Sequence, residues 1–121
     1  MPTATGHTKA IRASRVVGTN VYDTSGTKIG EIEDVILDKT SNQIMFAVLG
    51  FGGLLGVGEK YHPVPWSVLD YQEDKGGYVV PMTKEQLQSA PADSIDKLTE
   101  NDGTACRDQS YEYYKATPYW S

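Results

Sequence analysis

The segment Val21–Asp38 reads VYDTSGTKIGEIEDVILD, and it joins a stretch dense in turn residues, DTSGTK, to a long run typical of a β-strand. The apolar positions of the run do not alternate regularly, because Ile32 and Ile36 share one face with two aspartates. An insertion of one residue near Glu33–Asp34 would restore a single apolar face. We therefore predict a strand with a β-bulge at this point.

Outward from this segment, strand-like stretches alternate with turns about every ten residues. VVGTNVY overlaps the start of the segment, and IMFAVLGF, YHPVPWSVLDYQ and YVVP follow it. The clearest turn is DKGG at Asp74–Gly77, because adjacent glycines adopt positive φ without steric cost. This spacing is typical of a barrel or a sandwich rather than of βαβ units. We predict a mainly β fold of five to six antiparallel strands, followed by short C-terminal helices.

The helices are expected late in the chain. Thr83 and Gln86 have the spacing of a capping box for KEQLQSA, and Pro91 would end that helix. Asp108 is predicted to cap a second helix that runs through Lys115. The polar stretch Pro91–Ser110 is expected to run over the surface.

The stretch Ile44–Leu49 is apolar on both faces, which predicts a strand that is covered on both sides. The C-terminal segment or a second subunit would provide the outer cover. We expect an interface with a partner on this strand and on the glycine-rich loop after it. Its residues are Met45, Ala47, Leu49, Leu54, Leu55 and Val57.

The C-terminal SYEYYKATPYWS holds five of the twelve aromatic residues of the chain. Tyrosine and tryptophan combine a large contact area with a polar tip and are enriched at interfaces. We expect this segment to dock, either on its own barrel or across a dimer. The predicted contact residues are Tyr111, Tyr114, Tyr119 and Trp120.

Length and charge restrict the class of protein. The 121 residues suffice for one domain, and the net charge of −5 would repel a phosphate backbone, so no direct nucleic-acid partner is expected. The longest apolar run is far shorter than the about 20 residues of a membrane helix, so no membrane insertion is expected. Cys106 is the one cysteine, which fits a reducing compartment and predicts a cytoplasmic protein.

The sequence predicts three regions. Residues 1–13 form a basic, flexible leader without the apolar core of a secretory signal. Residues 14–90 form the β domain, and residues 91–121 form a C-terminal extension with the aromatic docking segment.

The glycine-rich stretch Leu49–Trp66 reads LGFGGLLGVGEKYHPVPW, which raises the possibility of a phosphate-binding loop. Neither the G-x-G-x-x-G nor the G-x-x-x-x-G-K-[ST] pattern fits it. Pro63 and Pro65 also disfavour the helix whose N-terminus would hold the anion. We interpret the stretch as a flexible connection between two strands, with no cofactor.

Candidates for chemistry are few. His62 is expected to be half-buried, with one hydrogen-bonded nitrogen, and Cys106 has no histidine near it in the sequence. Glu31 and Glu33 would share one face of a regular strand, which suits acid/base chemistry but equally a solvated face. Asp34 is expected to be buried and to hold backbone amides. No catalytic, cofactor-binding or metal-ligating residue is predicted.

The order VYDTSGTKIGEIEDVILD, a strand, a glycine-rich loop and VPWSVL resembles the PRC-barrel domain over about residues 14–90. The resemblance implies a small, strongly bent β-barrel that serves as a protein-interaction module, with no catalytic residues. It gives structural roles to Gly26, Gly30, Asp34, Pro65 and Trp66, with Ile29 also part of the pattern. The family includes the cytoplasmic part of the photosynthetic reaction-centre H subunit and the C-terminal half of a ribosome-maturation factor.

The sequence thus favours a cytoplasmic, homodimeric adaptor that is not an enzyme and whose protein partner is unknown. One alternative is an accessory factor in ribosome maturation or in a photosynthetic complex. The chain shows neither the membrane helix of the reaction-centre subunit nor the N-terminal domain of the ribosome-maturation factor, which weighs against this alternative. Another is a small-ligand-binding or enzymatic barrel that uses His62, Glu31, Glu33 and Asp34.

Overall fold

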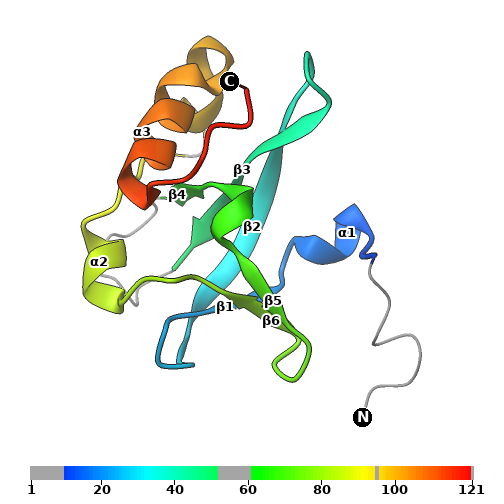
Figure 1. The fold of residues 1–121 in the computed structure, drawn as a ribbon, viewed down its shortest axis with the longest axis vertical. Helices are drawn as coiled ribbons and strands as arrows, with labels where there is room; N and C mark the ends of the chain where they lie inside the picture. The colour runs from blue at the N-terminus through cyan, green and yellow to red at the C-terminus, as the bar shows by residue number, and fades with distance from the viewer. Residues whose placement is uncertain (1–9, 52–60, 95, 121) are drawn as a thin grey trace.

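A computed structural model describes residues 10–51, 61–94 and 96–120 of the chain. One sheet holds six strands, in the order β4-β3-β2-β1-β6-β5 (Figure 1). The strands are β1 (Asn20–Tyr22), β2 (Lys28–Asp38), β3 (Gln43–Gly50), β4 (Tyr61–Val64), β5 (Asp70–Gln72) and β6 (Gly77–Val79). The prediction of a mainly β fold with five to six strands is confirmed.

The direction of one strand pair corrects the sequence-based prediction. All neighbouring strands are antiparallel except β1 and β6, which run parallel, with Val21 opposite Tyr78. No tight turn joins β6 to β1, so the geometry of a hairpin does not impose an antiparallel direction on this pair. At Gly77 an added Cβ would lie 2.5 Å from the Asn20 carbonyl oxygen, so glycine lets the two backbones approach.

β2 carries the bulge that the irregular pattern predicts. Ile32 lies opposite Leu49 and Asp34 lies opposite Val48, so Glu33 is the extra residue of the longer strand. Ile32 is buried and Glu33 is exposed. The insertion therefore turns the apolar side chain toward the core and the acid toward solvent, which confirms the predicted bulge.

The sheet must curl. In a flat sheet of six strands the edge strands β4 and β5 would lie about 24 Å apart. Only residues 65–69 connect them, and a 3₁₀ helix, η2 (Trp66–Val68), takes up three of these. Such a connection spans about 16 Å. The described strand pairings are those of a strongly bent sheet with two edges, and they include no β4–β5 pair that would close a barrel.

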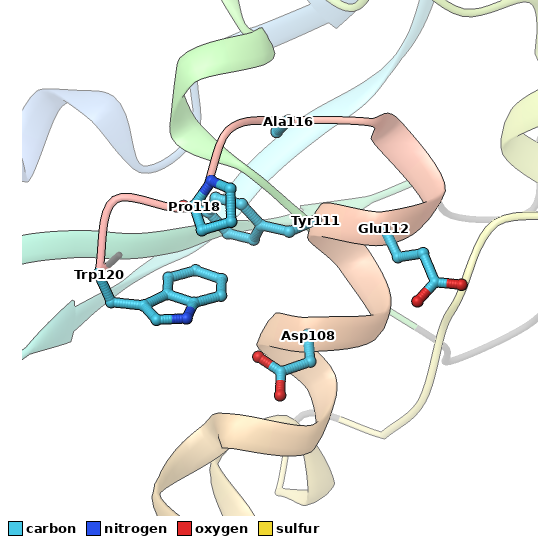
Figure 2. Close-up of a pocket in the computed structure, with 6 residues that line it drawn as sticks. All are labelled: Asp108, Tyr111, Glu112, Ala116, Pro118 and Trp120. Carbon is cyan, nitrogen blue, oxygen red and sulfur yellow. The ribbon is translucent and has the colours of Figure 1, made fainter.

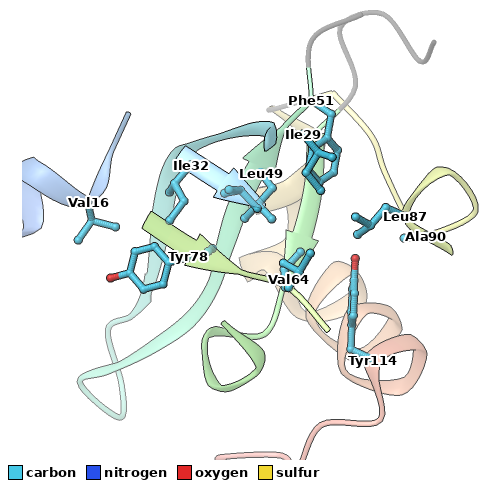
Figure 3. Close-up of a cluster of buried hydrophobic side chains, with 13 residues drawn as sticks. Val16, Ile29, Ile32, Leu49, Phe51, Val64, Tyr78, Leu87, Ala90 and Tyr114 are labelled. Carbon is cyan, nitrogen blue, oxygen red and sulfur yellow. The ribbon is translucent and has the colours of Figure 1, made fainter. Parts of the chain in front are cut away.

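The main core lies on the inner side of this bend (Figure 3). Side chains from all but one of the strands meet there, together with side chains from three helices. The helices concerned are α1 (Ala13–Val16), α2 (Lys84–Gln88) and α3 (Thr104–Tyr114). The core residues are Val16, Val21, Ile29, Ile32, Ala47, Leu49, Phe51, Val64, Tyr78, Val80, Leu87, Ala90 and Tyr114.

β3 is buried on both faces, as its apolar sequence predicts. Ala47 and Leu49 point into the main core, whereas Phe46 and Val48 point to the other side. There they form a second cluster with Leu98 of η3 (Lys97–Gly103), the 3₁₀ segment that leads into α3. The C-terminal segment of the same chain is therefore the cover of β3, and the cover lies over Phe46 and Val48.

This arrangement corrects the predicted partner contact on β3. Met45, Ala47 and Leu49 are at most 7% exposed within the chain. The sequence shows that the strand is apolar on both faces but not which face is the inner one, because that depends on the direction in which the sheet bends. Leu54, Leu55 and Val57 lie outside the described residues.

The helix predictions are met in part. Thr83 caps α2, its hydroxyl accepting from the Gln86 amide while the Gln86 side chain accepts from the Thr83 amide, so the capping box is confirmed. The predicted start of the last helix at Asp108 is wrong. α3 begins five residues earlier, after Gly103 at a φ of 72°, and it ends at Tyr114. Gly103 permits this sharp change of direction, and an added Cβ there would lie 3.0 Å from the Met45 sulfur.

Candidate protein-interaction surface

Three hydroxyl groups fix α3 to the rest of the domain. Ser110 Oγ donates to the Pro63 carbonyl of β4 at 2.6 Å, and Tyr111 Oη donates to the Met45 carbonyl of β3 at 2.9 Å. Both side chains are buried. Tyr113 Oη donates to the Gln86 carbonyl of α2 at 2.5 Å. Because each bond joins α3 to a different element, the helix is held in one orientation over the sheet edge.

The chain reverses direction after α3. Lys115 adopts a φ of 55°, and the Ala116 amide donates to the Tyr111 carbonyl at 3.0 Å. This left-handed C-cap sends the last residues back along the helix. Tyr119 Oη then donates to Asp38 Oδ2 at 2.6 Å. The C-terminal residues are thereby attached to the β2–β3 hairpin, far away in the sequence.

Asp38 is the common acceptor of this contact. Its carboxylate also accepts hydrogen bonds from Thr40 and the Ser41 amide in the turn between β2 and β3. The Tyr119 hydroxyl, followed by these turn groups, holds the pKa of Asp38 far below its usual value. Burial, and then the Asp38 carboxylate, raise the pKa of Tyr119 to about 12. At neutral pH the pair is a charge-assisted hydrogen bond between a phenol and a carboxylate.

The last aromatic side chains pack on one another. The Trp120 ring lies 4.8 Å from Tyr111 and 5.0 Å from Tyr119, both nearly edge-on. The guanidinium carbon of Arg107 lies 3.6 Å from the centroid of the Trp120 ring. Arg107 also contacts Asp108 at 3.1 Å. Trp120 is 38% exposed and thus presents a fixed indole to solvent.

A shallow cleft of 290 Å³ lies between this returning chain and α3 (Figure 2). It is lined by Asp108, Tyr111, Glu112, Ala116, Pro118 and Trp120. The side chains of Asp108 and Glu112 extend from α3, the Asp108 carboxylate toward Trp120 and the Glu112 carboxylate away from the rings of Trp120 and Pro118 (Figure 2). Both charged groups of the lining are therefore acidic, and the remaining lining is aromatic or aliphatic.

The predicted contact residues of the aromatic segment fall into two groups. Tyr111 and Tyr114 are buried within their own chain, so the expectation that they contact a partner is wrong. Tyr119 is half-buried, and Trp120 is the most exposed of the four. In this structure the segment docks on its own domain. The choice between this docking and docking across a dimer depended on the reversal at Lys115, for which the sequence offers no clear signal.

The structure does not bring together the residues of the alternative hypothesis, a ligand-binding or enzymatic barrel that uses His62 and the acids of β2. Glu31, Glu33 and Asp34 are exposed on β2. His62 of β4 pairs with Leu49 and points into the main core. The Glu33 side chain instead lies across Gly50, whose added Cβ would approach it to 2.7 Å. Leu49 and Gly50 face opposite sides of the sheet, so the acids and the imidazole are separated by it.

His62 is more deeply buried than its sequence context suggests. The side chain is fully buried, and neither ring nitrogen has a hydrogen-bonding partner among the described residues. Its ring packs 4.9 Å from that of Phe51. Burial lowers the pKa of His62 to about 4, and the Pro91 carbonyl, which lies near the ring without good hydrogen-bond geometry, opposes this shift. The prediction of a half-buried histidine with one hydrogen-bonded nitrogen is therefore wrong.

The carboxylate that organises a turn is Asp23, not Asp34. Asp34 is exposed and accepts from the adjacent Val35 amide at 2.7 Å, so the prediction that it is buried is wrong. Asp23 is 8% exposed and accepts from the hydroxyl and amide of Ser25 and from the Thr27 amide. These bonds, with the Ser25 hydroxyl first, lower the pKa of Asp23. The D-x-S-x-T spacing is the sequence signal that identifies this turn.

The other residues with predicted structural roles lie at close approaches and turns. Gly26 has a φ of 86° in the turn between β1 and β2. An added Cβ at Gly30 would lie 2.3 Å from the Gly50 carbonyl oxygen, so this position of β2 has no room for a side chain. Pro65 is buried, and the Trp66 ring packs 5.5 Å from Tyr78.

Among the described residues, no group of three or more potential ligands could hold a metal ion. No helix in the described part of the chain is both long and apolar enough to cross a membrane.

A comparison with curated proteins found no match. The family model of the PRC-barrel domain matches residues 9–87, which is more than half of the chain. With the bent six-stranded sheet and its bulged second strand, this match shows that the chain belongs to the PRC-barrel domain family.

Proposed function

We propose that this PRC-barrel protein is a non-enzymatic adaptor that binds a partner protein through the cleft beside Trp120. The observation that carries the proposal is the exposed indole on the rim of a preformed cleft. Aromatic anchors in clefts supply much of the binding energy at protein interfaces, because they bury a large area with little loss of side-chain freedom.

The rigidity of the surroundings supports the same proposal. α3 is fixed by three hydroxyl-to-carbonyl hydrogen bonds, and the returning chain is fixed by the bond from Tyr119 to Asp38. A surface that is already ordered loses little conformational entropy on binding. The separation of His62 from the acids of β2 favours a binding role over acid/base catalysis.

The proposed adaptor acts in the cytoplasm as a homodimer. The single cysteine fits a reducing compartment. Ile11 and Val17, on either side of α1, are each 46% exposed. A second copy that packed there would cover apolar surface that the chain itself leaves open. Light scattering on the full chain over a range of concentrations tests this, and a monomer throughout would contradict it.

The cleft is tested with Trp120→Ala in quantitative affinity capture from the native cell. Tyr71→Ala is the matched control, because it removes another exposed aromatic that lies on β5. We expect a specific partner to be retained by the wild type and by Tyr71→Ala and to fall at least tenfold with Trp120→Ala. Equal capture by all three proteins would contradict the proposal. The same experiment shows whether the partner belongs to the ribosome or to a photosynthetic complex.

A further inference from the structure

We propose that the cleft beside Trp120 receives the side chain of an arginine that the partner protein presents. This inference rests on the proposed interaction role and specifies the chemistry of the partner. It is carried by the charges and the shape of the cleft lining.

The two ionisable side chains of the lining that carry charge at neutral pH are both negative. Asp108 and Glu112 are four residues apart on α3, so the two positions are neighbours on the helix surface. Both are exposed, and in Figure 2 the Asp108 carboxylate lies toward Trp120, whereas the Glu112 carboxylate points away from the rings of Trp120 and Pro118. Asp108 uses Oδ1 to bind Arg107, whereas Glu112 has no ion pair among the described residues. A cation in the cleft would therefore meet the carboxylate of Asp108, which is only partly occupied, and would be attracted at longer range by that of Glu112.

The rest of the lining suits the flat, weakly hydrated guanidinium group and its aliphatic stem. The rings of Tyr111, Pro118 and Trp120 and the methyl group of Ala116 form the apolar part of the cleft. A volume of 290 Å³ is near the lower limit of small-ligand pockets, about 300 Å³, and fits one side chain rather than a cofactor. Arginine stacks on aromatic rings and binds carboxylates through two parallel hydrogen bonds, which lysine does not do.

The structure contains an example of the same contact. Arg107 stacks on Trp120 with its guanidinium carbon 3.6 Å from the ring centroid. Arg107 itself is not one of the residues that line the cleft. The wider extension also favours a cationic partner, because residues 91–121 contain six acidic and three basic side chains. Such a field attracts positively charged segments and repels acidic ones.

The other classes of side chain fit less well. An acidic side chain would be repelled by Asp108 and Glu112, since like charges at short range are unfavourable. An apolar side chain would remove water from the two carboxylates without offering a hydrogen bond, which costs free energy. A guanidinium group can donate hydrogen bonds to a carboxylate and contact the rings at the same time.

The test follows the indole NH signal of Trp120 by NMR while N-acetyl-arginine amide is added. N-acetyl-citrulline amide, which has nearly the same shape without the charge, is the matched probe at equal ionic strength. We expect a saturable shift of the Trp120 signal with the arginine probe only, and an unchanged signal from Trp66. Glu112→Gln should weaken binding at least threefold, whereas Glu85→Gln, which removes an exposed acid on α2, should have no effect.

Equal shifts with both probes, no shift with either, or unchanged binding to Glu112→Gln would overturn the arginine assignment. The failure of this inference is distinct from that of the proposed function. A partner that is lost with Trp120→Ala but kept by Glu112→Gln leaves the adaptor role in place and removes the role of the acids. If the arginine probe binds while no captured protein depends on Trp120, the cleft chemistry stands and the adaptor role fails.

Discussion

At the scale of single residues, His62 has the most unusual environment. It lies fully buried on β4, against Phe51, and its ring nitrogens have no hydrogen-bonding partner among the described residues. Burial therefore holds the imidazole neutral and lowers its pKa to about 4, from the about 6.5 of a solvated histidine. In the unfolded chain the ring is solvated and binds a proton at higher pH.

The first prediction concerns the pH dependence of stability. Between pH 6.5 and 4 the unfolded state binds more protons at His62 than the folded state does, so acidification favours unfolding. We expect this group alone to reduce the free energy of unfolding by about 2–3 kcal/mol between pH 7 and 4.5. Urea unfolding at the two pH values measures the change. In His62→Leu the free energy of unfolding should fall by about 2–3 kcal/mol less over this pH range than in the wild type. An equal fall in the two proteins would contradict the prediction.

Two aspartates show how far single residues can be interpreted from sequence. Asp34 stands among apolar residues in the sequence but is exposed, because the bulge at Glu33 rotates it out of the core. Asp23 stands in a polar stretch but is nearly buried. Its carboxylate accepts hydrogen bonds from groups of its own turn in place of water. Local composition alone therefore misjudges the burial of both, whereas the spacing of turn residues identifies the second.

At the scale of elements, α3 depends on hydroxyl groups as well as on apolar contacts. The Tyr111 hydroxyl is buried and binds the Met45 carbonyl on β3. If the hydroxyl is removed, this carbonyl loses a buried hydrogen bond, which costs about 1–2 kcal/mol. The Tyr22 hydroxyl, on β1, makes only long contacts of 3.4 and 3.5 Å.

The second prediction compares these two tyrosines. Tyr111→Phe should lower the free energy of unfolding by about 1–2 kcal/mol, and Tyr22→Phe should change it by less than about 0.5 kcal/mol. Chemical denaturation followed by circular dichroism measures both variants. Equal stabilities for the two variants would show that the hydroxyl does not help to hold the helix.

The elements themselves were largely predictable. The bulged strand β2, the doubly apolar strand β3 and the capped helix α2 each carry a local pattern, and all three are present. The start of α3 could not be predicted from the sequence, because it is set by the positive φ of Gly103 and by the proximity of that glycine to Met45. That contact joins residues 58 positions apart, and no local pattern encodes it.

At the scale of the whole molecule, the C-terminal segment completes the fold. Phe46 and Val48 on the outer face of β3 are fully buried, and Leu98 of η3 packs against them. A chain without this segment would expose a contiguous apolar strand face. Such faces drive association, because apolar surface leaves water when it pairs with a second copy.

The third prediction is that removal of residues 97–121 causes association or loss of the fold. Size-exclusion chromatography and the binding of a hydrophobic dye should show larger species and exposed apolar surface. Removal of residues 118–121 alone should leave β3 covered and the main transition intact, because these residues do not belong to either apolar cluster. A well-folded shortened chain without association would contradict the role of the segment as a cover.

The sequence by itself determined the family, the bulge in β2, the capping box of α2 and the burial of both faces of β3. Each depends on residues close together in the chain, where spacing and side-chain type decide the local geometry. Only the tertiary structure decided which face of β3 is the outer one, that the aromatic segment docks on its own domain, and that acids and aromatics form a cleft around Trp120. These features depend on the bend of the sheet and on the reversals at Gly103 and Lys115, which bring distant residues together.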